Sequence, residues 1–260
     1  MNLEEIKSIV NQFEPIDLSS MDEVSLMKRV DHKFTLTKKQ LQNLLLKMSN
    51  DYSCLTIDNS RVFSYENQYF DTEDKKMFLF HHNGKRNRYK IRIRDYVESK
   101  LSFLEIKFKN NKSETIKNRI NLDFRERNIS NKESKFISEN SIFNYKEIES
   151  QLLNSFKRIT LVSLKNKERV TIDIELNFLN STKEINLTNL VIIEVKREKT
   201  SKQSALLSLL KENKIRATNF SKYAIGSILT SPELKYNRFK NKLRYLNKIH
   251  PDGNIWNSTF

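Results

Sequence analysis

The chain has 260 residues, of which 37% are hydrophobic, so it can bury the core of one large domain. Its formal charge of +15 predicts an acidic partner, which is a nucleic acid, an anionic membrane or a polyanionic small molecule. The single cysteine, Cys54, excludes a disulfide framework and a cysteine-rich zinc site, and no apolar run reaches the ~20 residues of a membrane helix.

Hydrophobic periodicity predicts helices and strands in alternation along the chain. The segment 2–14 is acidic and amphipathic, which predicts a helix rather than a signal peptide and therefore a cytoplasmic protein. A strand is expected at 29–36, followed by a helix at 37–49 with Thr37 as its N-cap. The further strands are expected at 61–72, 87–96, 101–109, 114–124, 168–178 and 189–198, and the further helices at 143–156, 201–213, 220–230 and 235–250. This pattern predicts an antiparallel-rich α+β protein with seven or eight strands.

Nearly every predicted strand has one apolar face and one face of long charged side chains. In "RYKIRIRDY", residues 88–96, the side chains of Arg88, Lys90, Arg92 and Arg94 share one face. The charged faces of the other strands carry Lys33, Glu105, Lys107, Lys117, Arg119, Arg169, Asp173, Glu175, Glu194 and Lys196. Two architectures fit this division: a sheet with one solvated face, or a closed barrel of about eight strands whose charged faces point inward and form a cationic tunnel. Periodicity alone does not choose between them.

The charged faces suit the binding of phosphate groups. Lysine and arginine bind phosphate oxygens through charge-assisted hydrogen bonds. The carboxylates of Glu105, Asp173, Glu175 and Glu194 would either neutralise neighbouring cations or hold a hard divalent ion that bridges phosphates. No Walker-type glycine-rich loop occurs, so side chains rather than backbone amides are expected to hold the phosphates.

Eight short motifs, in order, resemble those of a known family. They are "KF" at 33–34, "YFDT" at 69–72, "YKIRIRDY" at 89–96, "LEIKFK" at 104–109, "IKNRI" at 116–120, "ERVTID" at 168–173, "IIEVKRE" at 192–198 and "FSKYAIG" at 220–226. The chain resembles the VTC domain, the polyphosphate polymerase branch of the triphosphate tunnel metalloenzymes, a superfamily that also contains the CYTH proteins. The resemblance covers about 25–230. It implies a tunnel domain with an N-terminal helix at 1–230 and leaves 231–260 as a basic helical tail.

The resemblance implies transfer of the γ-phosphoryl group of ATP onto a growing polyphosphate chain, with Mn²⁺ or Mg²⁺ as cofactor. It implies that Glu194 binds the metal. Phosphate-binding roles carry over to Lys33, Arg92, Arg94, Lys107, Lys117, Arg158, Arg169, Ser221 and Lys222, and we add Lys90, Arg119 and Lys196 from the charged faces. In two places the sequence departs from the family: Phe156 replaces a common tyrosine, and Asn219 stands where some active polymerases carry lysine.

Three other functions stay open at this point. A tunnel-type triphosphatase and a non-catalytic polyphosphate or nucleotide sensor would use the same residues. The third function is nucleic-acid binding, which the charge fits but no nucleic-acid motif supports. The expected partners are therefore ATP and polyphosphate or triphosphate, with association to a membrane only through a partner protein. The basic tail, residues 235–248, is expected to dock on the domain as an amphipathic helix, and His81 and His82 are expected in a solvated loop.

Overall fold

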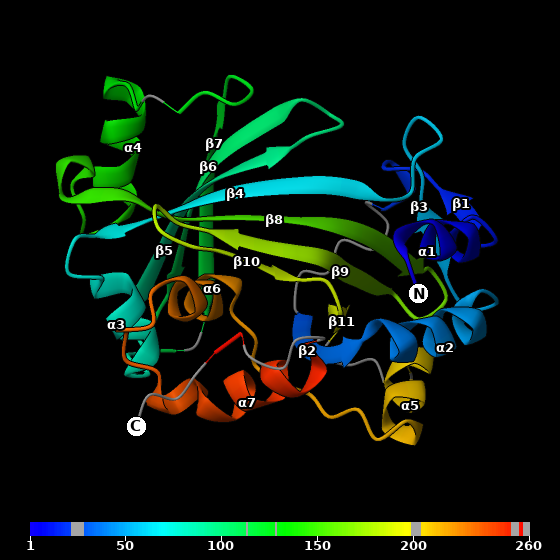
Figure 1. The fold of residues 1–260 in the computed structure, drawn as a ribbon. Helices are drawn as coiled ribbons and strands as arrows, with labels where there is room; N and C mark the ends of the chain where they lie inside the picture. The colour runs from blue at the N-terminus through cyan, green and yellow to red at the C-terminus, as the bar shows by residue number, and fades with distance from the viewer. Residues whose placement is uncertain (22–28, 113, 128, 199–203, 251–254, 257–260) are drawn as a thin grey trace. The chain divides into compact units, whose positions relative to one another are not determined.

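The computed structural model describes residues 1–21, 29–112, 114–127, 129–198, 204–250 and 255–256 (Figure 1). The chain forms two compact units, the first made of residues 1–63, 157–176 and 187–220, and the second of residues 64–156, 177–186 and 221–260. Two long strands, β8 (Ile148–Ser163) and β9 (Glu168–Leu179), contain residues of both units. Because the chain enters each unit more than once, neither unit is a contiguous segment.

The first unit packs three helices on the apolar face of antiparallel strands. β2 (Arg29–Thr37) pairs with β11 (Leu190–Glu198), which pairs with β9, and β8 follows in the strand order. The short strands β1 (Glu14–Ile16) and β3 (Ser53–Leu55) pair in parallel. The helices are α1 (Leu3–Val10), α2 (Lys38–Met48) and α5 (Ala205–Glu212), and their apolar residues share one core with those of β2, β9 and β11.

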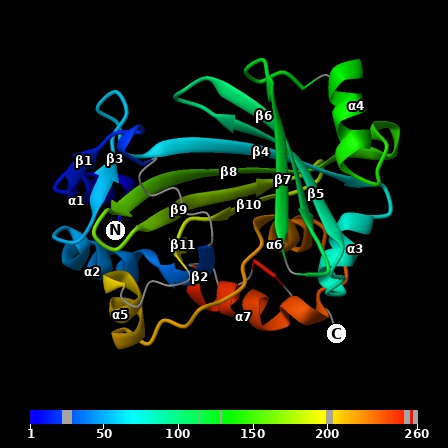
Figure 2. The same cartoon turned by 180° about the vertical axis from the view of Figure 1, so that it is seen from behind.

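The second unit places its helices around a sheet with the order β8, β4, β5, β6, β7. Its strands are β4 (Phe63–Thr72), β5 (Arg88–Tyr96), β6 (Leu101–Lys109), β7 (Thr115–Leu122) and β10 (Glu184–Leu187). Its helices are α3 (Lys76–His82), α4 (Asn131–Asn140), α6 (Lys222–Thr230) and α7 (Lys240–Ile249), with short 3-10 turns at Tyr145–Glu147 and Asn237–Phe239. Helix α4 lies beside β6 and β7 (Figure 2), where Ile137 packs with Ile91, Ile93 and Leu104.

The predicted fold class, an antiparallel sheet with flanking helices, is confirmed. The sheet has eleven strands rather than about eight, and among the described residues no pairing joins β2 with β7, so the hydrogen-bonded path is open. The helix expected at 143–156 is wrong, because most of this segment is the first half of β8. The loop expected around the two histidines is also wrong: His81 and His82 end helix α3, and His82 is buried.

The helix starts follow the local sequence. Thr37 accepts a hydrogen bond from the Gln40 amide while the Gln40 side chain accepts one from the Thr37 amide, which is a complete capping box before α2. Residues 201–203 of the predicted helix 201–213 lie outside the described residues, and α5 covers the rest up to Glu212. The predicted tail contributes α7, which is grouped with the second unit, and the boundary at residue 230 stays a prediction.

Candidate phosphate-binding site

The strand register of the second unit aligns three charged faces. Arg92 of β5 lies opposite Glu105 of β6, which lies opposite Arg119 of β7. Two residues along, Lys90, Lys107 and Lys117 form the next row. The alternate residues Ile91 and Ile93 point into the core with Leu104 and Ile106. Burial of this apolar face therefore fixes the cations of three neighbouring strands on the same opposite face.

Glu105 is the carboxylate that neutralises part of this face. It is fully buried and accepts hydrogen bonds from Arg92 through Nε at 2.8 Å and Nη2 at 2.6 Å, and it also pairs with Lys117. Tyr69 of β4 accepts a further hydrogen bond from Arg92 Nη1 at 3.3 Å. Burial alone would raise the pKa of Glu105, but Arg92, Arg94 and Lys117 outweigh it and hold that pKa well below its usual range. The carboxylate is therefore ionised at neutral pH, although it is buried.

The amine of Lys107 has no carboxylate in direct contact among the described residues. No hydrogen bond or ion pair to its amine is found within the described part of the chain, and its neighbours in the strand register are Lys90 and Lys117. Repulsion from Arg92, burial and Arg94 lower the pKa of Lys107 well below its usual value, against a smaller attraction from Glu105. A cation in this position favours an anionic ligand, because the ligand would supply the missing negative charge.

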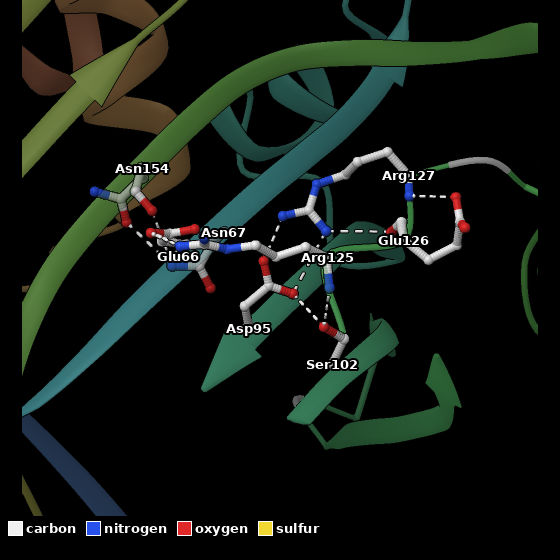
Figure 3. Close-up of polar contacts among 8 residues, drawn as sticks. All are labelled: Glu66, Asn67, Asp95, Ser102, Arg125, Glu126, Arg127 and Asn154. Atoms are coloured by element: carbon white, nitrogen blue, oxygen red, sulfur yellow. Dashed lines mark hydrogen bonds and ion pairs between the residues drawn. The ribbon is translucent and has the colours of Figure 1, made fainter. Parts of the chain in front are cut away.

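Arg94 is positioned by two buried amides that sequence reasoning missed. Its Nε donates to Asn67 Oδ1 of β4 at 2.8 Å, and Asn67 Nδ2 donates to the Asn154 carbonyl of β8 at 3.3 Å (Figure 3 shows both asparagines). Asn154 Nδ2 in turn donates to the Asn177 carbonyl at 2.7 Å. The sequence held one indication of this role: Asn67 precedes Tyr69 by two residues and therefore lies on the same face of the strand.

A second polar network lies on the other face of β5 and has a structural role. Figure 3 shows Asp95, which is fully buried, next to Ser102 and Arg127. Ser102 Oγ donates to Asp95 at 2.5 Å and accepts from the Arg125 amide at 3.1 Å, and Arg127 pairs with the Asp95 carboxylate. This network fastens the segment that follows β7 to β5 and β6, so Asp95 does not belong to the phosphate site.

The N-terminus of α6 approaches the same charged face. Ser221 caps the helix by accepting from the Ala224 amide at 3.2 Å, and its hydroxyl also accepts from Lys90 Nζ at 3.0 Å. The amine of Lys222 lies 4.2 Å from the centre of the Phe156 ring, which stacks on Tyr65. Phe156 thus offers a ring face to the lysine, where the family's tyrosine would add a hydroxyl. A helix N-terminus with two lysines beside it is a ready site for a phosphate.

The first unit holds a separate cluster around Glu194 of β11. Its carboxylate lies 3.6 Å from Lys33 Nζ and 3.8 Å from Lys196 Nζ. Burial acts to raise the pKa of Glu194, but Lys33, Lys196 and Arg158 outweigh it and lower the pKa to about 2. Arg158 of β8 binds Asp173 of β9 with two hydrogen bonds, at 2.6 and 2.9 Å, and Arg169 lies opposite Lys196 in the register.

A divalent ion fits this cluster only with part of its ligands supplied by the substrate. No group of three or more Asp, Glu, His or Cys suited to a metal occurs among the residues that the structure describes. Both carboxylate oxygens of Asp173 accept hydrogen bonds from Arg158. Glu194 has longer ion pairs, so it is the carboxylate of this cluster that could bind an ion. Mg²⁺ is often bound by one or two carboxylates together with substrate phosphates. The carboxylate of Glu175 is engaged elsewhere, in an ion pair with Lys38 of α2.

The predicted site residues therefore fall into two groups. The second unit brings together Lys90, Arg92, Arg94, Glu105, Lys107, Lys117, Arg119, Ser221 and Lys222. The first unit brings together Lys33, Arg158, Arg169, Asp173, Glu194 and Lys196. Arg119 lies at the exposed edge of its group, with its guanidinium 4.6 Å from the Phe103 ring centre.

Comparisons with known proteins define the class of fold first. A proposed adenylate cyclase from Bacillus halodurans superposes with a TM-score of 0.50 at 13% identity, covering 82% of this chain and 97% of its own. A proposed adenylyl cyclase from Hippeastrum, described as having a dominant triphosphatase activity, gives a TM-score of 0.48 at 16% identity, covering 80% of this chain and 98% of its own. The first of these likenesses supports the tunnel fold class that the sequence predicts.

The family follows from the sequence itself. The model of the VTC domain matches residues 28–230, so this chain belongs to the VTC domain family, and the resemblance noted in the sequence is confirmed. No curated protein matches the chain. Within the described residues, no helix is long and apolar enough to cross a membrane.

Proposed function

We propose that this protein is a metal-dependent polyphosphate polymerase that transfers the γ-phosphoryl group of ATP onto a growing polyphosphate chain. The observation that carries the proposal is the charged face of β5, β6 and β7, where Lys107 has no carboxylate partner within the described chain and Arg92 and Arg94 are fixed by buried side chains. Membership of the VTC domain family supports the choice of substrate. Fixed cations of this kind stabilise the charge that spreads over the phosphoryl oxygens during transfer.

The roles within the second unit follow from the contacts of each side chain. Arg92 is held by Glu105 and Tyr69, so it offers a rigid guanidinium rather than a mobile one. Ser221 and Lys90 would bind a terminal phosphate at the start of α6, where backbone amides face an incoming anion. Because these groups are in place before the ligand arrives, little reorganisation is needed when it binds.

The metal would be Mn²⁺ or Mg²⁺ held by Glu194 together with phosphate oxygens of the nucleotide. When bound, such an ion neutralises phosphate charge and polarises the transferred group. Lys33 and Lys196 keep the Glu194 carboxylate ionised, and they supply cations beside the same phosphates. Asp173 would orient Arg158 rather than bind the ion, since both of its oxygens accept from that arginine.

The decisive experiment incubates the purified protein with ATP and Mn²⁺ and separates the products on a gel stained for polyphosphate. Long chains together with ADP are the expected result. Free orthophosphate without chains would replace the proposal with a triphosphatase, and unchanged ATP with measurable binding would replace it with a sensor. A Glu194→Ala variant should stay folded and lose its dependence on metal. A Glu212→Ala variant, altered at an exposed carboxylate of α5, is the matched control.

A further inference from the structure

The charged row of β5 does not end at the candidate phosphate site. Lys90 contacts Ser221 at 3.0 Å, and the next residue on the same face is Arg88. Because a strand rises about 3.3 Å per residue, Arg88 lies about 13 Å beyond Arg92 along β5. Arg88 is partly buried, and its Nη1 donates to the Lys85 carbonyl at 2.9 Å, which holds the guanidinium at the start of the strand.

Helix α7 brings a second set of cations to this end of the strand. The ring of His81, the penultimate residue of α3, stacks on Phe239 just before α7, with 5.8 Å between the ring centres. Figure 1 shows α3 beside one end of α7. Lys90, Arg88 and Lys242 all lie close enough to His81 to add to the effect of burial, and together these factors lower its pKa to about 3. His81 is partly buried, and its imidazole is neutral at pH 7 with these three cations near it.

Arg238 joins the same set through the turn between α3 and β5. Gly84 has a φ of +74°, and its backbone hydrogen can face the Arg238 guanidinium, because a Cβ added there would lie 2.4 Å from Arg238 Nη1. Arg88, Arg238 and Lys242 make no ion pair with a carboxylate among the residues that the structure describes. Burial lowers the pKa of both Arg88 and Lys242, so an anionic ligand that pairs with them would offset the cost of burying their charges.

We propose that Arg88, Lys242 and Arg238 form an extension of the phosphate site that binds the distal part of a linear polyphosphate chain. The proposal rests on the proposed function, since it takes the same chain beyond the residues that bind its terminal phosphates. Continuity favours a linear polyanion over a membrane surface: Lys90 contributes both to the Ser221 site and to the field at His81, so one row of cations joins the two places. A triphosphate bound along the rows of Arg92 and Lys90 would end before Arg88, which lies about 7 Å beyond Lys90 along β5, whereas a longer chain would continue to the extension.

The experiment measures the affinity of the full chain for two ligands, tripolyphosphate and long-chain polyphosphate, at several salt concentrations. The Arg88→Gln/Lys242→Gln double variant should bind long chains about tenfold more weakly and show a smaller salt dependence. Its affinity for tripolyphosphate should not change. Lys146→Gln, at an exposed lysine of the same unit, is the control and should bind both ligands normally. If the double variant folds poorly, the single Lys242→Gln variant repeats the test with the partly exposed lysine of α7 alone.

Three outcomes would overturn the extension. They are equal losses for both ligands, no loss for either, and a loss confined to binding of vesicles that contain anionic lipid. Failure of the proposed function has a different signature: ATP would yield no chains, while long polyphosphate would still depend on Arg88 and Lys242. Chain synthesis with unchanged polyphosphate affinity in the double variant would keep the polymerase and remove the extension.

Discussion

The Tyr223 hydroxyl of α6 donates a hydrogen bond to the fully buried carboxylate of Asp71 at the end of β4. Asp71 also accepts from the Met77 and Phe78 amides at 2.8 Å, so one carboxylate holds the first turn of α3 and the side of α6. Tyr223 follows Ser221 and Lys222 directly. Its anchor therefore fixes the helix end that presents Ser221 to Lys90.

Loss of the Tyr223 hydroxyl should destabilise the protein. In Tyr223→Phe, a buried oxygen of Asp71 loses one donor, which should lower the free energy of unfolding by about 1–2 kcal/mol in urea titrations. Tyr145→Phe is the control, because that hydroxyl makes no hydrogen bond among the described residues. Equal stability of the two variants would show that Asp71 does not depend on Tyr223.

Replacement of Lys107 should separate stability from binding. Lys107→Gln removes a cation that Arg92 and Arg94 repel, so the free protein should gain about 1 kcal/mol of stability. The same change should weaken tripolyphosphate binding about tenfold, because the ligand loses a charge-assisted contact. Urea unfolding and a binding titration on one preparation measure both effects. A loss of both stability and affinity would assign Lys107 a structural role instead.

Glu105 should control how stability depends on pH. Its pKa is lower in the folded protein than the ordinary value of 4.5, so its stabilisation is complete above about pH 4.5 and declines as the pH falls from there toward the lower pKa of the folded state. Glu105→Gln should therefore cost about 3–5 kcal/mol near pH 7, and the difference from the wild type should shrink toward pH 3. Urea unfolding at both pH values makes the comparison.

Two controls make the Glu105 result specific. Glu139→Gln removes an exposed carboxylate that pairs with Lys135, and it should change stability by less than about 0.5 kcal/mol at either pH. Tripolyphosphate should restore more stability to Glu105→Gln than to the wild type, since the ligand would replace the missing negative charge. A pH-independent difference between Glu105→Gln and the wild type would rule out the linkage.

Asn67 should act on phosphate binding through Arg94. Asn67→Leu removes the acceptor of Arg94 Nε, so tripolyphosphate affinity should fall about tenfold, whereas Arg94→Ala should abolish binding and turnover. Asn121→Leu, on an exposed β7 position opposite Phe103, serves as the matched control. If Arg94→Ala keeps full activity, the assignment of the charged face is wrong. If Asn67→Leu binds normally, Arg94 is oriented by other contacts.

Alternation in the sequence predicted most strands because their two faces meet different surroundings. In the middle of β5 and β6 every second residue is apolar and buried, so the period of two is strong and the charged face could be predicted from it. The segment 143–156 failed for a specific reason. Ile148, Leu152 and Phe156 are spaced by four, which satisfies both a helix face and a strand face, and only pairing within the sheet selects the strand.

Short elements escaped prediction because their stability comes from contacts far away in the sequence. β1 and β3 have three residues each and exist through their pairing with one another and with β8. Helix α3 begins without a side-chain cap from its own N-cap residue, Lys75, and Asp71 takes over that function from β4. Neither arrangement produces a local hydrophobic periodicity, so these elements could not be predicted from the sequence.

The sequence by itself determined the charged and apolar faces, the family and the identity of the cations, because side-chain direction along a strand depends only on local backbone geometry. The tertiary structure decided which of those charges neutralise one another. Register pairs Arg92 with Glu105 and leaves Lys107 without a carboxylate partner in the described chain. The packing of α2 brings Lys38 to Glu175. Such pairings depend on strand order and burial, which join residues that the sequence keeps far apart.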